Sequence, residues 1–154
     1  MSWDLVLVPP EHADDPAEWL EARVVEGTAA DPTEAKEHAA VILERRPELE
    51  ASEPDSEGII EVGLREEGGF PLTVLLDGAH AELAVPYWDL GKQGAEGARM
   101  VVDVVTALTA HTGWVAFDPQ KDEVIGLDDL HEAFTGGHAR GVGMAKEVGD
   151  EVAD

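Results

Sequence analysis

The stretch PLTVLLDGAHAELAVPYW, residues 71–88, decides the fold. Residues 71–76 form an apolar run typical of a strand, and Asp77-Gly78 is a tight-turn signal that flanking residues can extend into a longer loop. In the run that follows, apolar and polar residues alternate with a period of two, as in a strand with one buried face. One side holds Ala81, Leu83, Val85 and Tyr87, and the other holds His80, Glu82, Ala84 and Trp88. The stretch therefore predicts an antiparallel hairpin with one polar face.

Further strands and helices are indicated on both sides of this hairpin. Strand-like runs occupy residues 3–8, 59–64, 114–117 and 123–125, helical spacing occupies 17–26 and 33–46, and residues 47–58 form a polar, acidic loop. The longest helical pattern lies between the glycine-rich residues 91–97 and Gly113. The expected order is β-α-α-β-β-β-α-β-β. We therefore expect an α+β fold with an antiparallel-rich sheet of about five to six strands and three helices packed mainly on one face.

The chain has 154 residues, the length of one ordinary domain. Its composition changes after Leu127, where glycines replace most large apolar residues. We expect a single α+β domain over residues 1–126. Residues 127–154 are expected to form a short helix, around 128–134, and a flexible C-terminal tail.

The composition is strongly acidic, with 34 Asp and Glu against 10 Lys and Arg and a formal net charge of −24. This charge repels nucleic acid and anionic membranes, because both require cationic contacts, and it attracts basic proteins. We therefore expect a basic protein as partner, and neither nucleic acid nor a membrane. A solubility or high-salt adaptation, or a proteome rich in Ala, Glu, Gly and Val, explains the same charge without any partner.

The chain contains no cysteine, which excludes disulfides and thiolate catalysis and favours a reducing cytoplasm. No apolar run approaches the roughly 18 residues that a membrane-spanning helix needs. The first residues lack the basic and apolar regions of a signal peptide. A cytoplasmic location is expected.

The densest acidic segment extends from Glu44 to Glu67 and holds nine acids against three arginines. A solvated surface is the simplest interpretation, and a docking surface for a basic protein is the alternative. Tryptophan is frequent at binding hot spots, so Trp88, at the end of the hairpin strand, is added to this candidate docking surface. The candidate partner-binding residues are Glu48, Glu50, Glu53, Asp55, Glu57, Trp88 and Asp89.

The segment GWVAFDPQKDEVIG, residues 113–126, raises the question of a calcium site. Asp118, Gln120 and Asp122 have the 1-3-5 spacing of oxygen ligands in a calcium-binding loop. The sixth position is Glu123 instead of the required glycine, and the flanking residues are predicted strands. A hairpin turn is therefore the better interpretation.

The histidines offer little chemistry. His80 and Glu82 share the polar side of the hairpin strand and are compatible with a general base and its orienting carboxylate, although any polar sheet face produces the same pair. His131 and His138 lack the spacing of a zinc-protease helix and fall in the predicted tail. No phosphate-binding loop or nucleophile elbow is present. We therefore predict no catalytic residue, metal ligand or cofactor.

The two ends of the predicted domain resemble a known group of proteins. MSWDLVLVPP (residues 1–10) and GWVAFDPQKDEVI (residues 113–125) are similar to the opening strand and the closing hairpin of small, largely uncharacterised bacterial proteins, some of which look like immunity proteins of toxin systems. Trp3 and Trp114 replace the more usual residues of those segments. The resemblance implies an α+β fold in the cytosol and assigns no reaction.

A strong charge without recognisable chemistry leads to three hypotheses. The first is a non-enzymatic protein-binding module that sequesters a basic partner, as an immunity protein or antitoxin does. The second is a small enzyme or ligand-binding domain that uses the sheet face near His80, Glu82 and Trp88. The third is a nucleic-acid mimic, which requires acids spaced like phosphates along one face.

Overall fold

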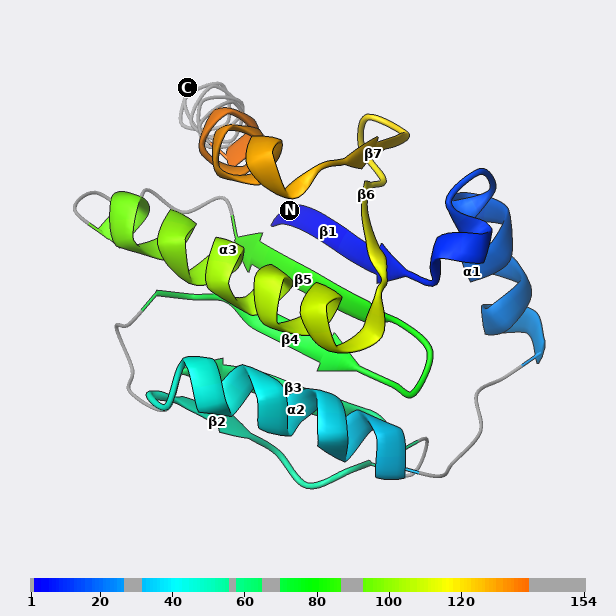
Figure 1. Cartoon of the computed structure of the whole chain (residues 1–154), viewed down its shortest axis with the longest axis horizontal. Helices are drawn as coiled ribbons and strands as arrows, with labels where there is room; N and C mark the ends of the chain where they lie inside the picture. The colour runs from blue at the N-terminus through cyan, green and yellow to red at the C-terminus, as the bar shows by residue number, and fades with distance from the viewer. Residues whose placement is uncertain (1, 27–31, 56–57, 65–69, 87–92, 139–154) are drawn as a thin grey trace, which may run out of the picture.

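The computed structural model describes residues 2–26, 32–55, 58–64, 70–86 and 93–138. Within these ranges the chain forms an antiparallel seven-stranded sheet in the order β2-β3-β4-β5-β1-β6-β7 (Figure 1). The strands are β1 (Ser2–Val8), β2 (Leu49–Ala51), β3 (Ile60–Leu64), β4 (Thr73–Leu76), β5 (Ala81–Pro86), β6 (Val115–Asp118) and β7 (Glu123–Ile125).

The helices are α1 (Pro16–Glu26), α2 (Thr33–Arg45) and α3 (Gln93–Thr112), with single 3-10 turns at η1 (Pro10–His12) and η2 (Leu127–Asp129). Residues 130–138 form a further helix. Helices α2 and α3 pack side by side on one face of the sheet (Figure 1). The predicted α+β class and the antiparallel sheet are confirmed.

The hairpin predicted from residues 71–88 is formed by β4 and β5. Val74 pairs with Leu83 and Leu76 pairs with Ala81, and all four side chains are buried. The connection spans the four residues 77–80, so the turn is longer than a two-residue Asp-Gly turn. The period-2 pattern therefore fixed the faces of these strands correctly.

The predicted number of strands was too low, because β2 falls in the segment that was expected to be a loop. Leu49 is only 5% exposed and pairs with Leu64 at the edge of the sheet. A strand of three residues with a single buried side chain has no period-2 pattern to detect. Edge strands are also commonly short and charged, which makes this one resemble a loop in sequence.

The main core lies between the sheet and the helices on its α2/α3 side. Ile42 of α2 and Val105 and Leu108 of α3 are fully buried in the same cluster as Val74 and Leu83 of the sheet. Burial of one such side chain stabilises the fold by about 1.5–3 kcal/mol. This packing holds strands β3, β4 and β5 rigidly and so fixes the positions of the side chains on their other face.

The opposite face is buried only toward β1 and β6. Val6, Val8 and Phe117 point away from α2 and α3 by register, yet none is more than 7% exposed. Helix α1 lies beyond the end of β1 (Figure 1). Its Trp19 meets the His80 ring edge-on at a centroid distance of 6.1 Å. Helix α1 therefore does not join α2 and α3 on their face, which corrects the expected helix arrangement.

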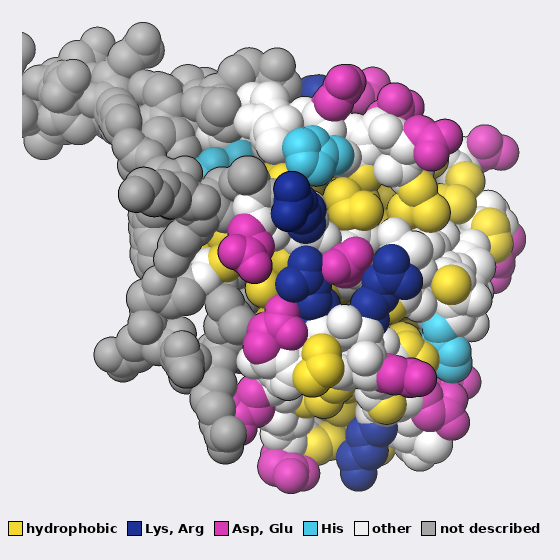
Figure 2. Space-filling view, turned by 60° about the vertical axis from the view of Figure 1, so that its left-hand side comes forward, with side chains coloured by type: hydrophobic (Ala, Val, Ile, Leu, Met, Phe, Trp, Pro, Cys, Tyr) yellow, Lys and Arg dark blue, Asp and Glu magenta, His cyan; other side chains and the backbone are white. Residues whose placement is uncertain are grey.

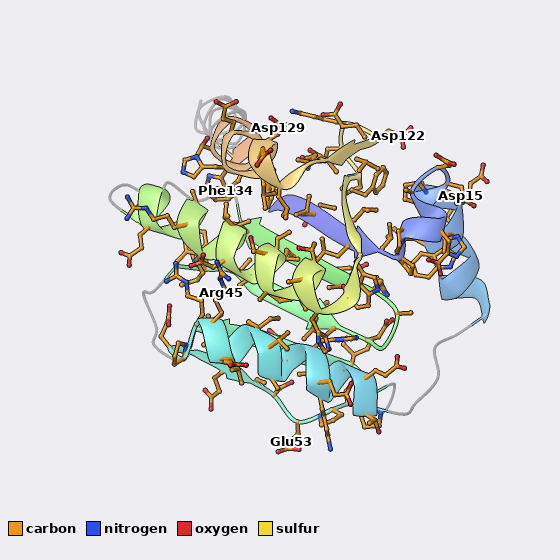
Figure 3. The ribbon with its side chains drawn as sticks, in the orientation of Figure 1. Asp15, Arg45, Glu53, Asp122, Asp129 and Phe134 are labelled. Atoms are coloured by element: carbon orange, nitrogen blue, oxygen red, sulfur yellow. The ribbon has the colours of Figure 1, made fainter. Side chains whose placement is uncertain are left out.

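Residues 130–138 form the short helix expected around 128–134, in addition to the three helices expected in the domain, and this helix belongs to the core. Leu130 and Phe134 are fully buried, and Figure 3 marks the position of Phe134. The Phe134 ring meets the Trp3 ring edge-on at a centroid distance of 5.0 Å. His138, expected in a solvated tail, is 6% exposed, and its Nε2 donates a hydrogen bond to the Pro86 carbonyl oxygen at 2.7 Å. The core thus extends past the domain boundary predicted at residue 126; residues 139–154 lie outside the described part of the chain.

Candidate functional site

Among the described residues, no helix covers the sheet face opposite α2 and α3 at β3, β4 and β5. Glu61 pairs with Leu75, and Leu75 pairs with Glu82, so these three residues form a row across the three strands. All three side chains are exposed, Leu75 to 38%. Because neighbouring strands lie about 4.8 Å apart, the two acidic residues belong to strands roughly 10 Å apart, with Leu75 between them.

A second row crosses the same face beside the first. From β2 to β1 it consists of Glu50, Gly63, Thr73, Ala84 and Asp4. The middle of this row holds only small, partly exposed residues, so the surface there is flat. We call the eight residues of the two rows the open face.

The open face carries no positive side chain. Four of its eight residues are acidic, and the strands that the structure describes contain neither Lys nor Arg. Arginines gather on the helical side instead, where Arg45 and Arg46 contact Asp103 of α3 at 3.4 and 2.8 Å. Figure 2 shows Lys and Arg side chains interspersed with acids at that end of the molecule. Within the described residues, negative charge on the sheet face thus contrasts with mixed charge on the helical side.

One border of the open face is formed by a charged cluster at the β4–β5 turn. Asp77 is buried, and its Oδ1 accepts hydrogen bonds from the backbone N–H groups of Ala79 and His80 at 2.7 and 2.9 Å. The Oδ2 atom of Asp77 lies 2.8 Å from His80 Nδ1. On the other side of the ring, His80 Nε2 lies 3.7 Å from Glu82 Oε1. His80 is thus held between two carboxylates.

These contacts change the protonation of all three groups. Burial alone lowers the pKa of His80, but Asp77 and Glu82 outweigh it and raise the pKa of His80 to about 9. Burial also opposes the charged form of Asp77, yet His80 and the two backbone N–H groups hold the Asp77 pKa well below its usual value. The contact with His80 lowers the pKa of Glu82, against a smaller effect of burial. At neutral pH the cluster is therefore an imidazolium between two carboxylates.

This protonation state limits the chemistry of the cluster. A general base must accept a proton near the working pH, and His80 already carries one there. The cluster is better suited to fixing the turn and the orientation of Glu82 on the open face.

Two aromatic rings extend the cluster toward α1. His12 stacks on Trp19 with ring centroids 4.8 Å apart, and Trp19 meets His80 edge-on. His12 Nδ1 also lies 3.6 Å from Asp15 Oδ1. Helix α1 and the β4–β5 turn are thus joined through these rings at the border of the open face.

The structure places the predicted acidic residues in different environments. Glu48 pairs with Arg46 at 3.0 Å, and Asp55 Oδ1 accepts the backbone N–H of Ile59 at 3.0 Å, which shapes the turn before β3. Glu53 is exposed in the loop after β2, and only Glu50 lies on the open face. The predicted residues Glu57, Trp88 and Asp89 lie outside the described residues.

The segment 113–126 forms the predicted hairpin, β6–β7. Asp118 is buried, and its Oδ1 accepts the backbone N–H groups of Gln120 and Lys121 at 2.9 and 3.3 Å. Asp122 adopts a positive φ of 54°, a conformation that Asp tolerates in turns. The Asp118 carboxylate thus stabilises its own turn.

Sequence reasoning missed Leu75 and the role of Asp77. An isolated exposed Leu has no distinguishing pattern in an apolar strand, and Asp77 appeared only as a turn residue. The pairing of His80 with Glu82 was visible, because period-2 alternation places residues two apart on one face. The contact between Asp77 and His80 depends on the shape of the four-residue turn, which the sequence leaves open.

Within the described ranges, no three His, Cys, Asp or Glu side chains are arranged to hold a metal ion. No helix in this part of the chain is long and apolar enough to cross a membrane. Comparison with known proteins finds no matching family model, and neither a curated protein nor a solved structure matches significantly.

Proposed function

We propose that this protein is a non-enzymatic binding module that sequesters a basic protein partner through its open face. The observation that carries the proposal is the exposed row Glu61–Leu75–Glu82, an apolar side chain flanked by two carboxylates on a rigid sheet. Protein interfaces commonly combine an apolar centre with a charged surround that steers the partner. A net charge of −24 accelerates the capture of a basic protein at low salt.

The protonation of His80 favours binding over catalysis. A pKa of about 9 leaves His80 without a free basic nitrogen at neutral pH, so the hypothesis of a general base at His80 and Glu82 loses its main support. A small-molecule site near His80, Glu82 and Trp88 remains the second candidate function. A bound ligand that displaces Glu82 from His80 would support it.

The distribution of acids favours a protein partner over mimicry of nucleic acid. Glu50 and Asp4 stand at opposite ends of a row with three uncharged residues between them. A mimic requires acids at the regular spacing of phosphates, about 3.4 Å of rise per nucleotide along one strand. Sparse acids around a flat, partly apolar centre fit a folded basic protein better.

An immunity-protein or antitoxin role is the specific form of this proposal. Such a protein needs no reactive group, only a surface complementary to a toxin. The resemblance of residues 1–10 and 113–125 to immunity-like proteins supports this form. A cytoplasmic location follows from the same interpretation.

Affinity capture with a matched pair of variants tests the proposal. Glu61→Lys reverses a charge on the open face, and Glu37→Lys makes the same change at an exposed position of α2, on the opposite side of the sheet. Proteins retained from an extract of the native host at physiological ionic strength are identified by mass spectrometry, and the retained protein is purified and tested for direct binding. We expect a basic protein retained by the wild type and by Glu37→Lys, and lost with Glu61→Lys. Equal retention by both variants would contradict the proposal.

A further inference from the structure

A groove lies between β7 and the helix of residues 130–138, away from the open face. Its volume is about 420 Å³. The strand contributes Val124 and Ile125, and the helix contributes Ala133 and Gly136. In Figure 3 the β6–β7 turn, marked by Asp122, and the beginning of this helix, marked by Asp129, stand beside each other on the same edge of the molecule.

The helix sequence explains why the groove is open. Leu130 and Phe134 face the core, whereas Ala133 and Gly136, one turn apart, face β7. An alanine and a glycine leave unfilled the space that larger side chains would occupy between a helix and a strand. The groove is thus a consequence of two small residues on one side of an otherwise well-packed helix.

Exposed apolar side chains adjoin this groove. Among the described residues, three large hydrophobic side chains are exposed. Two of them are Val124, 46% exposed, which lines the groove, and Leu127, 44% exposed, which lies in sequence between the lining residues Ile125 and Asp129. Single exposed apolar residues are ordinary, but two of them beside a groove mark a candidate contact surface. The third, Leu75, belongs to the open face.

Strand β7 is also the last strand of the described sheet. It pairs with β6 on one side only, through Ile125–Ala116, Val124–Phe117 and Glu123–Asp118. An edge strand leaves alternate backbone N–H and C=O groups free to pair with an added extended segment. A groove along such an edge offers side-chain contacts in addition to these backbone hydrogen bonds.

The charge around the groove selects the kind of segment that fits. Glu123, Asp129 and Glu132 line it together with a single cation, Lys121. Asp122 and Asp128 adjoin the lining residues in the chain, and in Figure 2 acidic side chains gather along the upper edge, at the height of this helix. A second copy of this chain would bring the same acids against each other, so charge disfavours self-pairing.

We propose that the β7 groove binds an extended cationic polypeptide segment of a partner protein, with alternating apolar and Lys or Arg residues, by adding it as a strand to the edge of the sheet. Apolar side chains on one face of the segment cover Val124, which by register lies on the same side of the sheet as Phe117. The other face of the segment lies over Ala133 and Gly136. Its cationic side chains reach Glu123, Asp129 and Glu132. This surface is separate from the open face, and the inference does not depend on the function proposed for that face.

A peptide titration of the full chain tests the inference. The probe is acetyl-KVKVKVK-amide, with acetyl-EVEVEVE-amide as the control of equal apolar content, and binding is followed by backbone amide NMR. We expect saturable shifts confined to β7 and residues 129–136 with the lysine peptide, and none with the glutamate peptide. Shifts located only on β3, β4 and β5, or equal shifts with both peptides, would overturn the inference.

Variants assign the binding to the groove. Val124→Lys removes an exposed apolar strand residue and adds a repelling charge, and Gly136→Leu fills the groove. Each variant is expected to bind the lysine peptide with an affinity at least about tenfold lower than that of the wild type, a difference of about 1.4 kcal/mol. Leu75→Lys is the matched control, because it makes the same type of change at an exposed strand position of the open face. An equal loss with Leu75→Lys would overturn the inference, and so would a wild-type dimer, detected by sedimentation, that Val124→Lys dissociates.

Discussion

His80 Nδ1 lies 2.8 Å from Asp77 Oδ2 across the turn that joins β4 to β5. This contact makes the turn a charged unit in which the imidazolium is held by a buried carboxylate on one side and Glu82 on the other. The same unit orients an acidic residue of the open face. The contacts that hold this turn therefore also hold Glu82 in place on the surface proposed to bind a partner.

The first prediction concerns the titration of His80. Its pKa in the folded chain is about 9, against an ordinary value of 6.5, so the cluster contributes stability fully below pH 6.5 and loses it as the pH rises through about 9. The contribution is at most roughly 3 kcal/mol. NMR titration of the imidazole measures the pKa, and urea unfolding at several alkaline pH values measures the stability. An imidazole that titrates at its ordinary value would contradict this account of the cluster.

The second prediction concerns Asp77→Asn. The amide oxygen of Asn can still accept the backbone N–H groups of Ala79 and His80, but the charge that stabilises the imidazolium is lost. We expect the pKa of His80 to fall toward its ordinary value and the free energy of unfolding at pH 7 to fall by about 1–3 kcal/mol. Urea unfolding at pH 7 and at pH 10 measures the stability with His80 charged and with His80 neutral. The loss should be smaller at pH 10, where His80 is neutral in both proteins, and an equal loss at the two pH values would show that the charge is unimportant.

The third prediction compares two adjacent glycines of the helix 130–138. A Cβ on Gly137 would lie 2.9 Å from Cδ1 and Nε1 of the Trp3 indole, which is packed against Phe134, whereas Gly136 faces the groove. We expect Gly137→Ala to destabilise the fold by about 1–3 kcal/mol through overpacking. Gly136→Ala should be neutral or stabilise it by up to about 1 kcal/mol, because alanine favours the helix. Thermal or urea unfolding decides between them, and equal effects would contradict the packing of this helix on Trp3.

The sequence was sufficient for those parts of the fold in which the hydrophobic pattern is regular. Strand β5 and its polar face, with His80 next to Glu82, followed from alternation alone, and the hairpin at 113–126 followed from its turn residues. Strand β2 was missed, because a single buried Leu49 gives no pattern. The burial of His138 was missed for another reason: its partner, the Pro86 carbonyl, is 52 residues away in the chain.

The candidate surfaces were harder to predict than the fold. The open face requires the register of four strand pairs, which places Glu61 and Glu82 on either side of Leu75 although the three are distant in sequence. The β7 groove requires the packing of helix 130–138 on the core; a short helix was expected around residues 128–134, but its burial was not. The density of acidic residues along the sequence indicated the segment around Glu48–Glu57 instead. There Arg46 pairs with Glu48, and the Asp55 carboxylate accepts a backbone N–H of the turn before β3.

The central claim is that the open face binds a basic protein, and the affinity of the captured partner for Glu61→Lys and Glu37→Lys tests it most directly. The two variants carry the same net charge, so long-range attraction is weakened equally and only local contact differs. Circular dichroism first establishes that both are folded. Titration calorimetry at physiological ionic strength is expected to show at least about a tenfold loss of affinity for Glu61→Lys and less than about a twofold loss for Glu37→Lys. Equal losses for the two variants would contradict the account, because binding would then follow total charge and not the row formed by Glu61, Leu75 and Glu82.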